Sequence, residues 1–288
     1  ETNSEEFLNT NGNLHVFKSE KGLLEGKETL RVLNNNNIPV VLVTPNQLKE
    51  MVPEITDDQF GALHSLESGR CLEPYGVVKA IFDHFIKIGG KFIMAEVKAI
   101  EKRSDHIDII CDDVRYEADN LVIACGYKSE KFANQIGLNA PLTAERGYHI
   151  MIPDPGLETE YALTHHERRF VITPMDHGIR LAGTVEFAHG EDKPNLKRAR
   201  MLVNFAQELL PGLSPEAKNE WVGSRPTLPD YLPVIDRADN VYFAFGHNHL
   251  GLTQAATTAK SIEKMMAGEK PSFIRNNSDR NPFSINRF

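Results

Sequence analysis

The spacing of apolar residues predicts a chain that mixes strands with helices. Continuous apolar runs predict strands at residues 39–43, 61–66, 92–94, 121–125 and 241–245. Apolar residues three and four positions apart predict helices over residues 77–88, 129–136, 196–210 and 255–266. The run 121–125 contains no polar residue, so we expect a strand that is buried on both faces, as in a parallel sheet.

Other segments alternate between apolar and polar residues, which predicts half-buried antiparallel strands. The alternation covers residues 107–111, 114–116, 148–152 and 179–187. Segment 221–233 contains Pro226, Pro229 and Pro233, and we expect it to form an irregular, rigid loop. The polar tail from Asn276 is expected to be loosely held.

Together these elements predict a mixed α/β (α+β) fold with two interleaved domains. Residues 76–142 and 233–288 carry strand–helix units and would form a partial, doubly wound dinucleotide-binding layer. Residues 1–75 and 143–232 carry the alternating strands and would form a substrate-binding domain with an antiparallel or mixed sheet.

Composition narrows the class of protein further. The 288 residues are 41% hydrophobic and 25% charged, which is typical of a globular protein and excludes a disordered or fibrous chain. The net charge of −8 disfavours nucleic acid as a partner. The three cysteines are far apart and have no metal-ligand spacing, so we expect no metal and a reducing cytoplasm. No apolar run approaches the length of a membrane span.

Two segments follow a predicted buried strand and could approach a cofactor. Residues 246–253 place glycines before a predicted helix, and a helix N-terminus favours an electron-rich group. Residues 124–126 end the strand 121–125 in small side chains. On the residues alone, both segments are also compatible with ordinary strand-to-helix turns.

Two side chains could contact a substrate. Arg225 lies in the proline-rich segment, where a guanidinium could bind a carboxylate or pair with a neighbouring acid. Tyr148 could present its hydroxyl at the sheet surface, although a tyrosine in such a strand is more often a core residue. The sequence has neither H-E-x-x-H nor G-x-S-x-G, which argues against a metalloprotease and a serine hydrolase.

The order of several motifs resembles the FAD-dependent D-amino acid oxidase superfamily, in particular its D-amino acid dehydrogenase and glycine oxidase branch. The motifs are LEPY from Leu72, LVIACG from Leu121, ERGYH from Glu145, LAGTVEF from Leu181, WVGSRPTLPDYLPVI from Trp221 and GHNHLGLT from Gly246. The resemblance implies an oxidoreductase that oxidises the Cα–N bond of a D-amino acid, or of a related amino or imino acid, by hydride transfer to flavin N5.

The resemblance also implies roles for individual residues. FAD would contact Val97, Ala124, Cys125, Gly126, Gly246, His247, Asn248, Leu250, Gly251, Leu252 and Thr253. Arg225 would bind the substrate carboxylate, with Tyr148 and His249 near the substrate. The electron acceptor, oxygen or a quinone, is left open, as is peripheral contact with the cytoplasmic face of a membrane.

One family feature is absent from the sequence. The family opens with a strand and G-x-G-x-x-G, and no such motif occurs here. We therefore expect that an N-terminal FAD-binding segment is missing or is supplied by a partner chain, and that the chain retains little FAD. Two alternatives remain, namely a non-catalytic binding or interaction module of this fold and an oxidase for secondary amines such as sarcosine or proline.

Overall fold

The computed structural model describes residues 2–112, 114–188, 192–274 and 280–288. The chain divides into two compact units, which are treated separately below. Unit 1 comprises residues 1–92, 147–185 and 193–222, and unit 2 comprises residues 93–146, 186–192 and 223–288.

An eight-stranded sheet supplies the framework of unit 1, in the order β14-β10-β13-β12-β11-β2-β4-β3, and three of its strands extend into residues of unit 2, namely 143–146, 186–187 and 223–227. Its strands are β2 (Asn13–Phe17), β3 (Val40–Val43), β4 (Gly61–Ser65), β10 (Thr143–Ile152), β11 (Ala162–His165), β12 (Phe170–Met175), β13 (Gly178–Phe187) and β14 (Lys218–Thr227). β11 pairs with β2 in parallel, whereas β12 pairs with β11 and β13 in antiparallel fashion. Two short strands, β1 (Leu8–Asn9) and β5 (Arg70–Cys71), pair separately.

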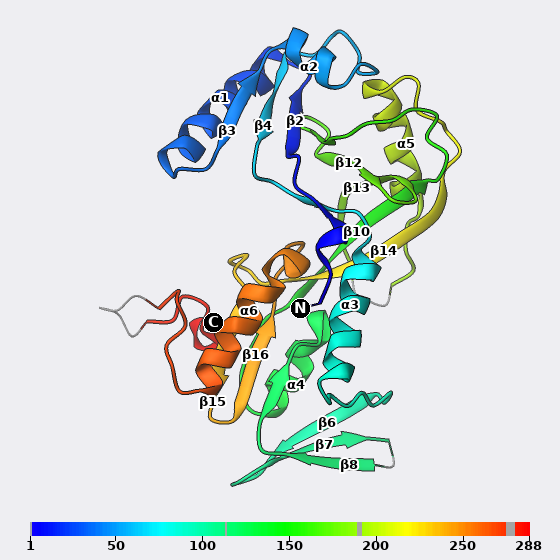
Figure 1. Cartoon of the computed structure of the whole chain (residues 1–288). Helices are drawn as coiled ribbons and strands as arrows, with labels where there is room; N and C mark the ends of the chain where they lie inside the picture. Colours follow the sequence, from blue (N-terminus) through cyan, green and yellow to red (C-terminus); the bar gives the residue numbers. More distant parts are fainter. Residues whose placement is uncertain (1, 113, 189–191, 275–279) are drawn as a thin grey trace. The chain divides into compact units, whose positions relative to one another are not determined.

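The helices of unit 1 are α1 (Glu20–Asn35), α2 (Pro45–Met51), α3 (Pro74–Lys87) and α5 (Lys197–Leu209), with a 3-10 turn, η1, at Glu5–Phe7. α1, α2 and α5 pack on the sheet through apolar side chains, whereas α3 contacts η1. α1 lies along β2, β3 and β4 (Figure 1). The predicted apolar stripe of α5 is confirmed, because Leu202 and Ala206 are fully buried in the main core beside Leu163.

The helix predicted over 77–88 is α3, but most of its apolar side chains are exposed. Only Val77 is buried, whereas Ile81, Phe85 and Ile88 are 49%, 42% and 69% exposed. The strand predicted at 92–94 is wrong, because these residues form neither a strand nor a helix.

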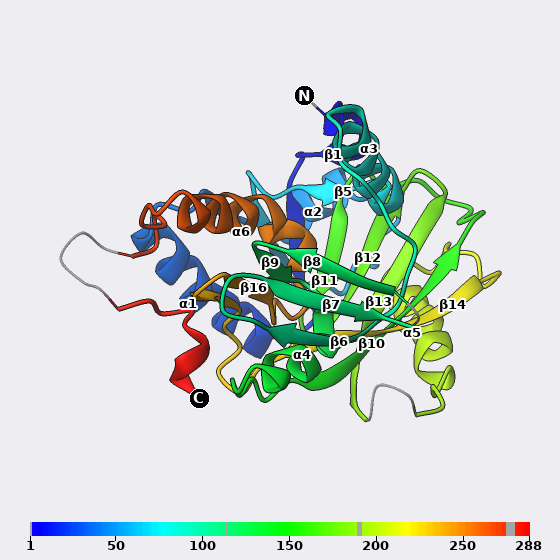
Figure 2. The same cartoon turned by 90° about the horizontal axis from the view of Figure 1, so that it is seen from below.

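Unit 2 contains two three-stranded sheets. One is β15-β16-β9, formed by β15 (Val234–Ala238), β16 (Val241–Phe245) and β9 (Leu121–Ile123). The other is β6-β7-β8, formed by β6 (Val97–Lys102), β7 (Ile107–Cys111) and β8 (Val114–Ala118), whose strands lie side by side in Figure 2. The helices are α4 (Ser129–Gln135) and α6 (Gly251–Met266), with 3-10 turns η2 (Gly126–Lys128) and η3 (Ile285–Arg287).

Pairing within the first sheet brings two chain turns to one edge. β9 runs parallel to β16, so both strands end at the same edge of the sheet. The prediction that the run 121–125 is buried on both faces is wrong, because the strand ends at Ile123 and Val122 is 40% exposed. β9 is the outer strand of this sheet, so only one of its sides is paired.

Three other expectations need correction. Residues 221–227 belong to strand β14 rather than to an irregular loop, and β14 tolerates Pro226 because it is an edge strand. The alternation at 179–187 fails after Thr184, whose φ of 57° interrupts the strand geometry, and Val185 and Phe187 are 43% and 69% exposed. Part of the tail, 275–279, lies outside the described residues, but Ile285 is buried, so the end of the chain is held.

Candidate cofactor and substrate site

The segment that joins β16 to α6 makes a tight turn. Gly246 has a φ of +82°, and a Cβ at this position would lie 2.6 Å from Leu228 Cδ1. Asn248, with a φ of 53°, donates from its backbone N–H to the Pro226 carbonyl at 3.1 Å and from Nδ2 to the Tyr231 carbonyl at 3.0 Å. The turn is therefore fixed against the chain that follows β14.

Helix α6 starts without a side-chain cap. Its N-cap residue is Leu250, and no side chain accepts a hydrogen bond from the first turn. The free amides and the helix dipole favour an electron-rich group at this end. His247 lies beside them, its Nε2 2.9 Å from Thr258 Oγ1, and burial lowers the pKa of His247 so that a neutral ring is favoured.

The turn after β9 lies at the same edge of the sheet. Ala124 and Cys125 are exposed, and Gly126 has a φ of +60°, which favours glycine. Buried Ser129 fixes the turn, because its Oγ accepts from the Cys125 N–H at 3.0 Å. Burial raises the pKa of the Cys125 thiol, so this side chain is a poor nucleophile at neutral pH.

An apolar hollow of about 660 Å³ adjoins both turns. It is lined by residues of β9, the turn after it, β16 and α6, among them Ala124, Ala244, Ile262 and Met266, together with His247. Positive-φ glycines, an uncapped helix start and an apolar hollow suit a flat ring system that carries negative charge, such as a reduced flavin. The residues present thus fit FAD.

Val97 lies at the start of β6, in the second sheet of unit 2, and is half-buried. Its strand is tied to α4, because the Ile100 N–H donates to Gln135 Oε1 at 2.9 Å. Val97 packs against the core cluster that contains Ile123 and Phe132, and its adenine contact stays a prediction.

Arg225 is half-buried near the end of β14. Burial lowers its pKa and nearby Glu145 raises it, although a guanidinium stays protonated under all ordinary conditions. Within the described part of the chain, the guanidinium of Arg225 makes no hydrogen bond and has no ion-pair partner within 4.0 Å. Such a cation is suited to binding an anion.

Glu145 and Tyr231 complete this group, and the sequence analysis assigned neither a role. Glu145 lies on β10 and is 6% exposed, and its Oε1 accepts a hydrogen bond from the Tyr231 hydroxyl at 3.1 Å. The only sequence signal was that Glu145 opens the motif ERGYH, and nothing in the sequence links it to Tyr231.

The two other expected substrate residues lie in different settings. His249 is exposed and makes no hydrogen bond to a described residue. Tyr148, in unit 1, is 1% exposed, and its hydroxyl oxygen accepts from the Asn195 N–H at 3.0 Å, so its side chain is part of the core. Contacts of either residue with a substrate stay predictions.

One cluster could geometrically surround a metal ion in the described ranges, namely His106, Asp108 and Glu117. Asp108 already pairs with Arg103 at 2.7 Å and with Arg115 at 3.5 Å. Two cations beside the shared carboxylate disfavour a third, so we assign no metal to this cluster.

Two parallel strands that end in glycine turns, beside an uncapped helix, are typical of dinucleotide-binding folds. Residues 3–265 match the DAO family, described as FAD dependent oxidoreductase, and the chain belongs to this family. The predicted family resemblance, the mixed α/β class and the expectation of FAD as the family cofactor are thereby confirmed.

Two relatives illustrate the sequence similarity. The chain is 28% identical to a D-amino-acid oxidase of Bradyrhizobium diazoefficiens, over 98% of the chain and 68% of the relative. It is 26% identical to D-amino acid dehydrogenase 2 of Mesorhizobium japonicum, over 90% of the chain and 65% of the relative. The chain thus spans about two thirds of the length of these relatives.

Solved structures show the same fold. Glycine oxidase from Geobacillus kaustophilus superposes with a TM-score of 0.87 at 20% identity, covering 98% of this chain and 76% of that one. L-Proline dehydrogenase from P. horikoshii gives 0.82 at 17% identity, covering 99% and 79%. Among the described residues, no helix is both long and apolar enough to cross a membrane.

Proposed function

We propose that the protein is part of an FAD-dependent oxidoreductase that oxidises the Cα–N bond of an amino acid, with a D-amino acid as the expected substrate. The names of the two relatives support the substrate class. The observation that carries the proposal is the half-buried, unpaired Arg225 next to the turn that precedes α6.

In this proposal Arg225 binds the substrate carboxylate with two parallel hydrogen bonds. Its place on β14, before Pro226, limits its freedom, so binding costs little additional ordering of the backbone. The turns 124–126 and 246–253 hold the cofactor, and bound FAD would accept the hydride that leaves Cα. The chain itself supplies orientation rather than a nucleophile.

The cofactor is tested first. Purified protein that carries a flavin spectrum, or acquires one with added FAD, supports the enzyme. Protein that stays colourless in excess FAD favours either a binding or interaction module or a chain that needs a further FAD-binding segment, and addition of that segment separates the two. Anaerobic addition of amino acids to the loaded protein should bleach the flavin, and comparison of D-alanine, L-alanine, sarcosine and proline separates the substrate classes.

Arg225 is tested next. Arg225→Ala should raise KM for amino acids roughly ten- to hundredfold, because a charge-assisted contact of about 1.5–3 kcal/mol is lost. Arg225→Lys should do so less, since it keeps the charge without the planar fork.

The matched control for Arg225 is Arg168→Ala. Arg168 is paired with Glu208 at 2.9 Å, and its loss should leave KM unchanged. If Arg225→Ala lowered the melting temperature and left KM intact, Arg225 would be a structural residue and the carboxylate would bind elsewhere.

A further inference from the structure

Glu145 and the proposed substrate-binding cation, Arg225, lie on neighbouring strands, because β10 pairs with β14 in the eight-stranded sheet. Glu145 raises the pKa of Arg225, yet the two side chains form no ion pair within 4.0 Å in the described ranges. The Glu145 carboxylate and the Arg225 guanidinium therefore interact electrostatically without a direct hydrogen bond. A ligand anion on Arg225 would also experience the negative charge of Glu145.

The position of Glu145 is fixed rather than adaptable. Its side chain is 6% exposed and accepts from the Tyr231 hydroxyl. Tyr231 is held in turn, because its N–H donates to the Leu228 carbonyl at 3.0 Å and its carbonyl accepts from Asn248 Nδ2. Its φ of 59° is unusual for a tyrosine, so the surrounding contacts impose this conformation.

We propose that Glu145 is a specificity-determining residue, whose fixed negative charge beside Arg225 makes the site favour zwitterionic amino acids over carboxylates that lack an ammonium group. A simple carboxylate brings one negative charge towards Glu145 and is repelled. An α-amino acid brings an ammonium group on the neighbouring carbon, which offsets this repulsion. Discrimination by a repulsive element is a common route to specificity. The inference rests on the proposed function, because it requires that Arg225 binds the carboxylate.

The test uses two ligands of the same shape that cannot be oxidised. 2-Aminoisobutyrate lacks a Cα hydrogen and is a zwitterion, and isobutyrate is its analogue without the amine. Isothermal titration calorimetry on the FAD-loaded protein gives the two dissociation constants and their ratio. In Glu145→Gln, isobutyrate should bind more tightly and 2-aminoisobutyrate should not, so that the preference for the zwitterion falls about tenfold, as one pKa unit of interaction implies.

Tyr231→Phe is the matched control. It removes the hydrogen bond to Glu145 and keeps the carboxylate, so the preference for the zwitterion should persist. Equal changes for both ligands in Glu145→Gln, or the same fall in Tyr231→Phe, would overturn the inference and assign Glu145 a structural role only. If the wild-type protein bound neither ligand, or if Arg225→Ala left both affinities unchanged, the proposed function itself would fail.

Discussion

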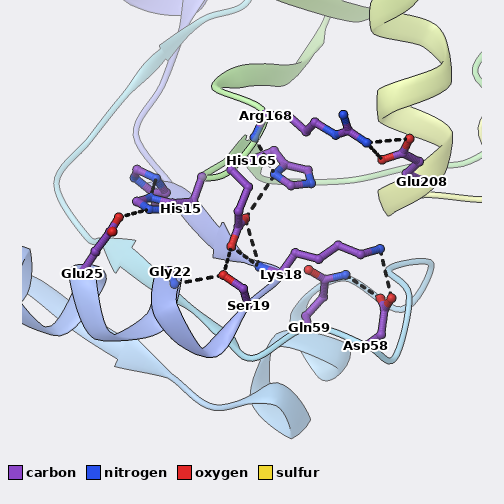
Figure 3. A network of polar contacts seen from close by, with 12 residues as sticks. His15, Lys18, Ser19, Gly22, Glu25, Asp58, Gln59, His165, Arg168 and Glu208 are labelled. Atoms are coloured by element: carbon purple, nitrogen blue, oxygen red, sulfur yellow. Dashed lines mark hydrogen bonds and ion pairs between the residues drawn. The ribbon is translucent and has the colours of Figure 1, made fainter.

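Around His165 in unit 1, each of the acidic side chains Glu25 and Glu167 has a hydrogen-bond or ion-pair partner. In unit 2, by contrast, the guanidinium of Arg225 has no direct partner among the described residues. Glu167 accepts from the Lys18 N–H at 3.0 Å and from Ser19 Oγ at 2.8 Å. Lys18, Ser19 and His165 are labelled in Figure 3. Glu25 pairs with His166 at 2.9 Å. The charges around His165 hold α1 to the sheet, whereas the charge of Arg225 is available for a ligand.

Backbone geometry separates the two clusters less clearly than charge pairing does. In unit 1, Ser19 caps α1, because its side chain accepts from the Gly22 N–H. Gly246, Asn248 and Tyr231 in unit 2 have positive φ values, but so does Arg169, whose N–H donates to the His165 carbonyl. The comparison of the two clusters therefore rests on how their charges are paired.

The largest expected effect on stability comes from Gly246→Ala. Its φ of +82° disfavours any side chain, and the new Cβ would overlap Leu228 Cδ1 at 2.6 Å. We expect a loss of about 2–3 kcal/mol in the free energy of unfolding, measured by urea denaturation, together with weaker FAD binding.

Gly251→Ala is the control for this turn. Gly251 starts α6, and a Cβ there would meet nothing closer than His247 Cβ at 3.9 Å. Stability should stay the same or rise slightly, since alanine favours a helix. Equal losses in both variants would show that the turn before α6 has no special geometry.

The sequence predicted some of the helices and strands of both units and missed others. The strands at 241–245 and 61–65 and the helices α5 and α6 were predicted because their apolar spacing is strong. Helix α1 was missed, because it is polar on average and packs through only a few residues such as Leu23, Leu30 and Leu33. Its buried Gly26 makes room for the Phe17 ring, and the spacing of apolar residues around Gly26 does not predict this contact.

The candidate site was predicted in part for a similar reason. Turns 124–126 and 246–253 each follow a recognisable strand, so their meeting at one edge follows from parallel pairing. Glu145 and Tyr231 are 86 positions apart, and only the folded chain joins them. The sequence predicted a loop at 221–227 because prolines are rare in strands, but an edge strand tolerates them.

A smaller effect is expected from Glu167→Gln in the cluster around His165. The amide loses the charge and presents only one acceptor oxygen to Lys18 and Ser19, so the link between α1 and the turn after β11 weakens. We expect a loss of about 1–2 kcal/mol in the free energy of unfolding, with unchanged ligand affinity at Arg225. Glu28→Gln removes an exposed carboxylate from the same helix and should change stability by less than about 0.5 kcal/mol.

A contradictory result for this cluster would be informative. If Glu167→Gln left stability unchanged and altered ligand binding, the matched cluster would not be purely structural. The distinction between matched and unmatched charges would then fail as a guide to function in this chain.

The smallest expected effect concerns pH and His149 on β10. Burial, and then the positive charge of Arg180, lower the pKa of His149 from 6.5 to about 4. Well above pH 6.5 the ring is neutral in the folded and unfolded states, so it does not change the free energy of unfolding. As the pH falls from 6.5 to 4 the unfolded chain takes up a proton that the folded chain resists, so stability decreases.

His149→Phe isolates this contribution, because phenylalanine keeps the stacking on Trp221, whose ring centroid lies 4.8 Å away, and does not titrate. Because His149 is only half-buried, solvent screening reduces its share to about 1 kcal/mol. Urea denaturation at a series of pH values should show that the variant loses less stability than the wild type over this range. Burial also lowers the pKa of His15, His165 and His247, so part of the acid sensitivity should persist in the variant. Parallel curves for the two proteins would mean that His149 protonates as readily in the folded chain as in the unfolded one.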